Sequence, residues 1–468
     1  MTVDTLRLTA EAAAGLVANG EISSDELFDA YRAAIDARDG ELHCYVRLCD
    51  RGEPAGIPIA LKDVIGTKGV ETTAGSKILA GYVPVYDSTV AARCKGVGLR
   101  LLGKTNTDEF AMGSSTENSA FGPSRNPWDP TRVPGGSGGG SAAAVTAGMA
   151  PWALGSDTGG SIKQPSALCG NVGLRPTYGT VSRYGIVAFA SSLDQVGPVA
   201  RTVRDCALLY SIIAGRDPAD TTTVEAPPVE LPEAENLKGL RIGLPVEMRD
   251  AAGIEPGVRD AVARAVSLCE ELGATVEECS LPRSVEYGLP CYYLIAPAEA
   301  SSNLARYDGV RYGYRGEGDG LIEVYERTRD EGFGDEPKRR IMLGTYALSA
   351  GYYEAFYGKA QQVRTVIIRE HAAVFERFDL IVSATSPTVA FPIGERADDP
   401  LAMYAADLLT IPSCMAGLPG ISIPCGLSEG LPVGLQLVGP QLAENTLFRA
   451  GCALERAIGF DTVPERLR

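Results

Sequence analysis

Two glycine–serine loops hold the residues whose types and spacing could do chemistry. The first covers residues 135–141 and the second residues 159–161, and an apolar, alanine-rich segment separates them. We expect that segment to form a buried helix followed by a short strand. Glycines let a chain bend sharply and leave backbone N–H groups uncovered. Ser161 ends the second loop, so its hydroxyl would lie beside amide donors, and the pattern predicts serine-dependent acyl transfer.

A serine nucleophile needs a base, and histidine is scarce in this chain. His43 lies near the N-terminus and His371 lies in a polar helical stretch, both far in sequence from the loops. Each is most simply interpreted as a surface or helix-face histidine. The sequence also has no G-x-S-x-G elbow, so a Ser-His-Asp triad is disfavoured.

Lys62 is the alternative base, because it interrupts the apolar stretch 56–65. Burial disfavours a charged ammonium and lowers the lysine pKa, and a neutral amine can accept a proton. Ser137 lies between Gly136 and Gly138, and its hydroxyl can both donate and accept. We therefore expect a proton relay from Ser161 through Ser137 to Lys62.

Simpler interpretations stay open for each of these residues. Lys62 could lie at a strand edge and reach solvent, or pair with Asp63. Ser137 could be a turn residue, and Ser161 could be the N-cap of a helix, a position that would also favour a developing anion. The loop at 138–143 loosely matches a dinucleotide pattern, but no strand precedes it and no G-K-[ST] follows it, so a nucleotide loop is disfavoured.

The elements that must position these residues alternate between strands and helices, which predicts an α/β fold. Apolar periodicity predicts helices, and short apolar runs predict strands. Segment 215–239 is rich in proline, threonine and acidic residues and is expected to be a surface linker. The polar segment 298–345 is expected to be a lid or pocket wall, and RNA contact there is disfavoured because acidic residues balance the basic ones. The expected helices are 8–38, 203–214, 258–272, 363–378 and 444–457, with another helix at the start of 90–104. The expected strands are 43–48, 56–65, 99–102, 240–244, 275–279, 379–384, 421–424 and 432–438, and short strands and turns are expected after Pro176, including segment 180–189.

Composition limits the possible classes of function. The 468 residues carry a formal net charge of −16, which disfavours DNA and anionic membranes as partners. The eleven cysteines show no C-x-x-C pairing and no histidine cluster, so we expect no metal site and a reducing, cytoplasmic setting. The first residues lack the pattern of a signal peptide.

The sequences around both loops, GGSGGGSAAAV and GSDTGGSIKQPSALCGNVGLRPTYG, resemble the amidase signature family. That resemblance implies a large central mixed sheet covered by helices on both faces. It also implies one amidase domain over residues 1–468, with N-terminal helices in 1–50, a catalytic core in 51–214, the linker 215–239, and a C-terminal half in 240–468 that carries a substrate-pocket insertion. The implied site residues are the Lys62–cis-Ser137–Ser161 triad and an oxyanion hole formed by the backbone of Thr158, Gly159, Gly160 and Ser161.

Five further stretches resemble one branch of the family, the A subunits of tRNA-dependent amidotransferases. These stretches are 103–129, 184–198, 298–313, 335–353 and 416–426. The resemblance implies a glutaminase in which Arg340 and Asp407 hold the amino-acid end of glutamine, since a carboxylate needs a guanidinium and an ammonium needs a carboxylate. It implies a heterotrimer with two partner chains, the B and C subunits. Ammonia would pass to a partner that uses ATP and magnesium to amidate Glu-tRNA(Gln) or Asp-tRNA(Asn), with tRNA held mainly by the B subunit. This chain itself would need no cofactor.

The chain departs from the family pattern at several positions. Gly138 replaces the usual second serine of the first loop, Lys163 replaces the usual arginine after the nucleophile, and Val64 stands where asparagine is frequent. The segment between Leu48 and Gly56 is shortened. None of these changes removes a triad member. Two alternatives stay open: a stand-alone amidase that acts on another small amide, and a non-enzymatic subunit that keeps only the fold.

Overall fold

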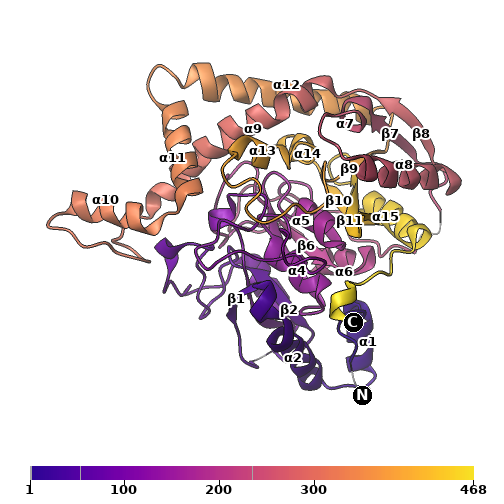
Figure 1. Ribbon diagram of the computed structural model, residues 1–468, viewed down its shortest axis with the longest axis horizontal. Helices are drawn as coiled ribbons and strands as arrows, with labels where there is room; N and C mark the ends of the chain where they lie inside the picture. The colour runs from indigo at the N-terminus through magenta and orange to yellow at the C-terminus, as the bar shows by residue number, and fades with distance from the viewer. Residues whose placement is uncertain (1–2, 53, 234–235) are drawn as a thin grey trace.

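One large mixed sheet runs through the part of the chain that the computed structural model describes, residues 3–52, 54–233 and 236–468 (Figure 1). Within those residues the sheet has eleven strands in the order β1-β3-β2-β4-β6-β5-β10-β11-β9-β7-β8. Residues 1–2 at the expected N-terminal segment, residue 53 in the shortened segment and residues 234–235 of the expected linker lie outside the described residues. Strands from both sides of segment 215–239 therefore share one sheet.

The strands that carry the predicted site lie in the first half of the sheet. β2 is parallel to both β3 and β4, whereas β4 is antiparallel to β6. The two halves of the sheet meet where β5 pairs antiparallel with β10. The strands are β1 Tyr45–Leu48, β2 Pro58–Lys62, β3 Arg100–Thr105, β4 Trp152–Asp157, β5 Val172–Arg175, β6 Gln195–Ala200, β7 Arg241–Pro245, β8 Thr275–Cys279, β9 Leu380–Ala384, β10 Gly420–Ser428 and β11 Leu431–Val438.

Helices cover both faces of this sheet. A Cβ built on Gly434 of β11 would lie 2.4 Å from the Cβ of Ala167, which belongs to α5. One built on Gly451 of α15 would lie 3.8 Å from Ile421 of β10, so α15 covers the opposite face together with α6 and α8. The predicted fold class is therefore confirmed. The helices are α1 Ala10–Ala18, α2 Ser24–Leu42, α3 Thr89–Gly96, α4 Gly139–Thr146, α5 Lys163–Cys169, α6 Val203–Ile213, α7 Val246–Arg249, α8 Pro256–Glu271, α9 Pro282–Asn303, α10 Leu321–Gly332, α11 Asp335–Leu348, α12 Lys359–Phe375, α13 Pro400–Ala405, α14 Ile411–Met415 and α15 Glu444–Ile458.

Local sequence explains several of these boundaries. A capping box starts α2: the Ser23 side chain accepts from the backbone N–H of Glu26, and the Glu26 carboxylate accepts from that of Ser23. The alanine-rich segment between the loops forms α4 and then β4, as expected. Segment 180–189, where short strands and turns are expected, contains turns and two isolated bridges, at Val181 and Ile186, but no longer strand. Neither β5 nor β6 was located by its own range in the sequence, and Gly197 of β6 lies so close to β5 that a Cβ there would be 2.1 Å from the carbonyl oxygen of Leu174.

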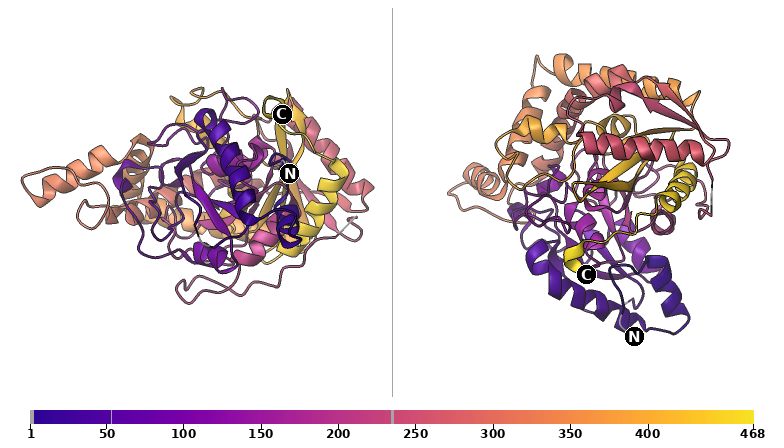
Figure 2. Two further views of the ribbon diagram at one scale, coloured as in Figure 1. Left: turned by 90° about the horizontal axis from the view of Figure 1, so that it is seen from below. Right: turned by 45° about the vertical axis from the view of Figure 1, so that its right-hand side comes forward.

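The segment expected to be a polar lid or pocket wall is largely helical. Residues 298–345 hold the end of α9, all of α10 and most of α11. α9 packs against α11, α12 and α14, while α10 projects away from the body of the molecule (Figures 1 and 2). No helix among the described residues is long and apolar enough to cross a membrane.

Candidate active site

Lys62 is the last residue of β2 and is completely buried. Its Nζ lies 2.6 Å from Ser137 Oγ, 3.0 Å from Ser156 Oγ and 3.2 Å from the Ser156 carbonyl oxygen. Burial lowers the pKa of this amine to about 7, although nearby carboxylates, chiefly that of Asp108, oppose the shift. Lys62 therefore neither reaches solvent nor pairs with Asp63, whose carboxylate faces Lys104 instead.

The loop that carries Ser137 is glycine-rich because backbone passes close to it on several sides. A Cβ on Gly136 would lie 2.3 Å from Asp108 Oδ2, and one on Gly140 would lie 2.5 Å from the carbonyl oxygen of Asn106. No side chain fits at either position. The peptide bond between Gly136 and Ser137 is cis.

Ser161 lies against this loop and is 7% exposed. Its carbonyl oxygen accepts the N–H of Gly138 at 3.1 Å. A Cβ on Gly138 would lie 2.5 Å from that oxygen and 3.9 Å from Lys62 Nζ. The structure thus brings Lys62, Ser137 and Ser161 to one place.

The interpretation of Ser161 as a helix N-cap is wrong. Helix α5 begins at Lys163, and Ile162 occupies the cap position. The carboxylate of Asp157 accepts the N–H of Ile162 at 3.0 Å, so it supplies the capping contact that a serine would have made. The Ser161 hydroxyl is consequently not used in capping.

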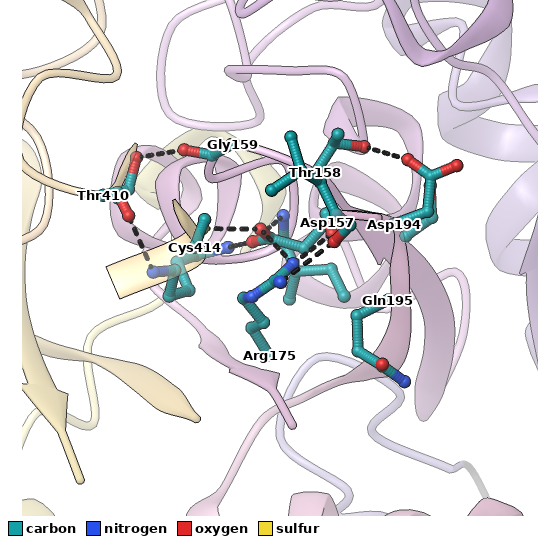
Figure 3. Close-up of polar contacts among 12 residues, drawn as sticks. Asp157, Thr158, Gly159, Arg175, Asp194, Gln195, Thr410 and Cys414 are labelled. Atoms are coloured by element: carbon teal, nitrogen blue, oxygen red, sulfur yellow. Dashed lines mark hydrogen bonds and ion pairs between the residues drawn. The ribbon is translucent and has the colours of Figure 1, made fainter. Parts of the chain in front are cut away.

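The loop 157–161 is held by its carbonyls and side chains rather than by its amides (Figure 3). Thr158 Oγ1 donates to Asp194 at 2.7 Å, and Thr410 Oγ1 donates to the Gly159 carbonyl at 2.6 Å. Across the described part of the chain, the N–H groups of Gly159, Gly160 and Ser161 donate to no acceptor. Free amide donors beside a nucleophile are what an oxyanion requires.

A buried cluster of polar and charged residues contacts Asp157 at the start of loop 157–161. Most of these contacts were not predicted from the sequence. Arg175 Nη1 donates to the Asp157 carbonyl and lies 3.3 Å from Asp157 Oδ1, with Cys414 on the same oxygen (Figure 3). Burial alone would raise the pKa of Asp157, but the charges of Lys163 and Arg175 hold it below its usual value. The available signal was an arginine at the end of the apolar run in residues 172–175.

Lys163, which replaces the usual arginine, is also fully buried. Its Nζ donates to Ser413 Oγ at 2.9 Å and to Gln436 Oε1 at 2.8 Å. The ammonium of a lysine at this position therefore finds hydrogen-bond acceptors on α14 and β11.

Asp407 lies on the other side of the nucleophile loop. Its Oδ2 accepts the hydroxyl of Ser114, while its Oδ1 is buried without a hydrogen-bond partner among the described residues. A Cβ on Gly160 would lie 3.3 Å from that Oδ1. Burial raises the pKa of Asp407 to about 7, and the Ser114 hydrogen bond opposes this. A buried, unpaired carboxylate oxygen invites a cationic ligand.

Arg340 is buried on α11 and is enclosed by aromatic rings. Its Nε donates to Glu336 Oε1 at 2.7 Å, and its Cζ lies 5.2–5.5 Å from the ring centres of Phe189, Tyr293 and Tyr404. Within the described residues its Nη atoms donate to no acceptor, which leaves the N–H groups along one edge of the guanidinium for a ligand. Asp407 is close by, since its N–H donates to the Tyr404 carbonyl at 3.2 Å.

Neither histidine belongs to this site. His43 is exposed at the end of α2. His371 is buried on α12, where its Nδ1 lies 3.0 Å from the carbonyl oxygen of Ile367, and burial lowers its pKa. Among the residues that the structure describes, no group of three or more His, Cys, Asp or Glu side chains could hold a metal ion.

Comparisons with known proteins agree with this geometry. Residues 45–448 match the Amidase family. The chain is 57% identical to the glutamyl-tRNA(Gln) amidotransferase A subunit of Moorella thermoacetica, covering 97% of each chain, and 55% identical to that of a Roseiflexus species, again covering 97% of each. The crystal structure of the same enzyme's A subunit from Thermotoga maritima superposes with a TM-score of 0.85 at 45% identity, covering 99% of this chain and 98% of that one. The chain therefore belongs to the amidase family.

Proposed function

We propose that this chain is the glutamine-hydrolysing subunit of a tRNA-dependent amidotransferase. The observation that carries the proposal is the unpaired, buried oxygen of Asp407 beside Gly160 of the nucleophile loop. With Arg340 near it, the site offers an anion to an α-ammonium and a cation to an α-carboxylate. The high identity to amidotransferase A subunits supports the same substrate.

The triad supplies the chemistry of amide cleavage. Ser161 attacks the side-chain carbonyl carbon of glutamine while its proton passes to Ser137 and the Ser137 proton passes to Lys62. The free amides of Gly159 to Ser161 stabilise the oxyanion. Lys62 returns the proton to the leaving nitrogen, so ammonia departs and a glutamyl ester remains on Ser161. Water then hydrolyses the ester, which releases glutamate and regenerates the serine.

The fate of ammonia defines the partners. Under the proposal, ammonia passes to the B subunit, which binds ATP and magnesium and amidates activated Glu-tRNA(Gln) or Asp-tRNA(Asn), and the C subunit completes a cytoplasmic heterotrimer. This chain carries no cofactor of its own. Its net charge of −16 supports the assignment of tRNA binding mainly to the B subunit.

The test compares glutamine with butyramide, which keeps the amide but lacks both charged groups. The full chain, purified with the subunits that co-elute with it, should release ammonia from glutamine with a kcat/KM at least about a hundredfold above that for butyramide. A fluorophosphonate should label Ser161 in the wild type and leave Ser161→Ala unlabelled. A chain that purifies alone and cleaves both amides equally would instead be a stand-alone amidase, and a folded chain without labelling or activity would refute an enzymatic role.

A further inference from the structure

Three consecutive residues, 108–110, connect the loop that carries Ser137 with helix α11, which carries Arg340. Asp108 Oδ2 accepts the N–H of Thr116 at 2.9 Å and occupies the space that a side chain at Gly136 would need. It therefore contacts the loop that carries Ser137. The ring of Phe110 lies 5.5 Å from that of Phe333, just before α11.

Glu109, between them, reaches the start of α11. Its side chain is buried, and its Oε2 accepts the N–H of Gly334 at 2.9 Å while its Oε1 accepts the hydroxyl of Ser76. Gly334 is the N-cap residue of α11 and has no side chain to cap the helix. A Cβ there would lie 2.4 Å from Glu109 Oε2. A carboxylate from the catalytic half thus caps the helix from outside, where the helix dipole also favours it.

Helix α11 links Gly334 to Arg340, so the position of the helix start sets the position of Arg340. Arg340 lies less than two turns after Gly334, and Glu336, which binds its Nε, lies in the first turn. A cavity of about 310 Å³ adjoins the start of the helix and is lined by Glu109, Gly334 and Asp335, among others. There is therefore room for the helix start to move if its contact with Glu109 is lost.

We propose that Glu109 is a positioning residue that fixes the start of α11 and thereby places the Arg340 guanidinium for the substrate carboxylate. This inference rests on the proposed function, because it needs Arg340 to bind that carboxylate. Glutamine at position 109 could keep both contacts, because its oxygen can accept from Gly334 while its NH2 group donates to the Ser76 hydroxyl, which also accepts. Glu109→Met instead keeps roughly the size of the side chain and removes both acceptor oxygens.

The test uses two substrates, glutamine and 4-aminobutyramide, which lacks only the α-carboxylate. In the full chain with its co-eluting subunits, Glu109→Met should raise the KM for glutamine about tenfold, leave kcat within about twofold, and leave kcat/KM for 4-aminobutyramide unchanged. Ser76→Ala removes only the contact with Oε1 and should shift the same KM about threefold. Glu331→Met, a matched change at the same cavity, should alter the kinetics of neither substrate.

A double-mutant cycle separates positioning from general structural damage. Glu109→Met should cause no further loss in an Arg340→Ala background, because it acts through Arg340. A full additive loss there, or an equal loss on both substrates, would overturn the role of Glu109 while leaving the proposed function intact. If Arg340→Ala itself keeps the preference for glutamine over 4-aminobutyramide, Arg340 does not bind the carboxylate. That result would refute the proposed carboxylate site, and the role of Glu109 would fail with it. If Glu109→Met does not fold, an unchanged KM in Ser76→Ala overturns the inference.

Discussion

Replacing Lys62 by methionine removes the amine but keeps an unbranched side chain in the buried site. The pKa of about 7 determines what fraction of the amine is neutral and able to accept a proton. At pH 7.5 about three quarters of the amine is neutral, whereas an ordinary lysine would be about one part in a thousand neutral. Because a positioned general base contributes about 10²–10⁴-fold, we expect Lys62→Met to slow acylation of Ser161 by about that factor.

The assay is the rate at which phenylmethylsulfonyl fluoride labels Ser161 between about pH 5.5 and 9. The probe is uncharged, so it bypasses Asp407 and Arg340 and reports the triad alone. In the wild type the rate should rise about tenfold per pH unit and level off above about pH 7, because only the neutral amine accepts the proton. Lys62→Met should lose this step.

Lys104 offers a matched control, since it is an equally buried lysine on the neighbouring strand β3. Its Nζ donates to the Ile65 carbonyl and to Thr72, away from both serines. Lys104→Met should lower the melting temperature but keep the pH step in the folded fraction. A wild-type rate that is flat across pH 7, or a Lys62→Met variant that keeps the step, would refute the assignment of Lys62 as the base.

Three further predictions concern Asp407, the buried ion pair and the first loop. Because the carboxyl of Asp407 has a pKa of about 7, the KM for glutamine should rise as pH falls below 7, and Asp407→Asn should raise the KM about tenfold and abolish this dependence; steady-state kinetics with butyramide as control check both. Arg175→Met leaves Asp157 buried without its ion pair, so urea unfolding should show a loss of about 3–5 kcal/mol, and a loss below about 1 kcal/mol would contradict the buried pair. Gly138→Ser places a Cβ 2.5 Å from the Ser161 carbonyl oxygen, so the labelling rate should fall about tenfold, and an unchanged rate would show that the loop can shift.

Much of the fold could be predicted from local patterns. The helix at 203–214 and the strand at 275–279 are confirmed as α6 Val203–Ile213 and β8 Thr275–Cys279. Helix α11 could not be found in this way, because its buried face lacks an apolar stripe and consists of Glu336, Pro337, Arg340, Gly344 and Ala347. Strand β6 was missed because it contains glycine and proline in its middle.

Some residues of the candidate site could likewise be predicted from the sequence, and others could not. Lys62 and the two serines are visible in the sequence because each interrupts an apolar or glycine-rich run. Arg340 and Asp407 could be named only by resemblance, since nothing local distinguishes them from other charged residues. The contacts of Asp194 with Thr158 and of Glu109 with Gly334 join segments that are distant in sequence, so only the folded chain reveals them.

The seam where β5 pairs with β10 has a consequence for synthesis on the ribosome. Every triad member precedes β5, whereas Arg340 emerges much later and Asp407 just before β10. Under the proposed function, the nucleophile is therefore synthesised long before the residues that would hold the amino-acid end of glutamine. Until β10 is translated, the backbone groups of β5 that pair with β10 lack those partners, and such a strand edge is prone to pair with another chain. Pairing of β10 with β5 removes that exposed edge.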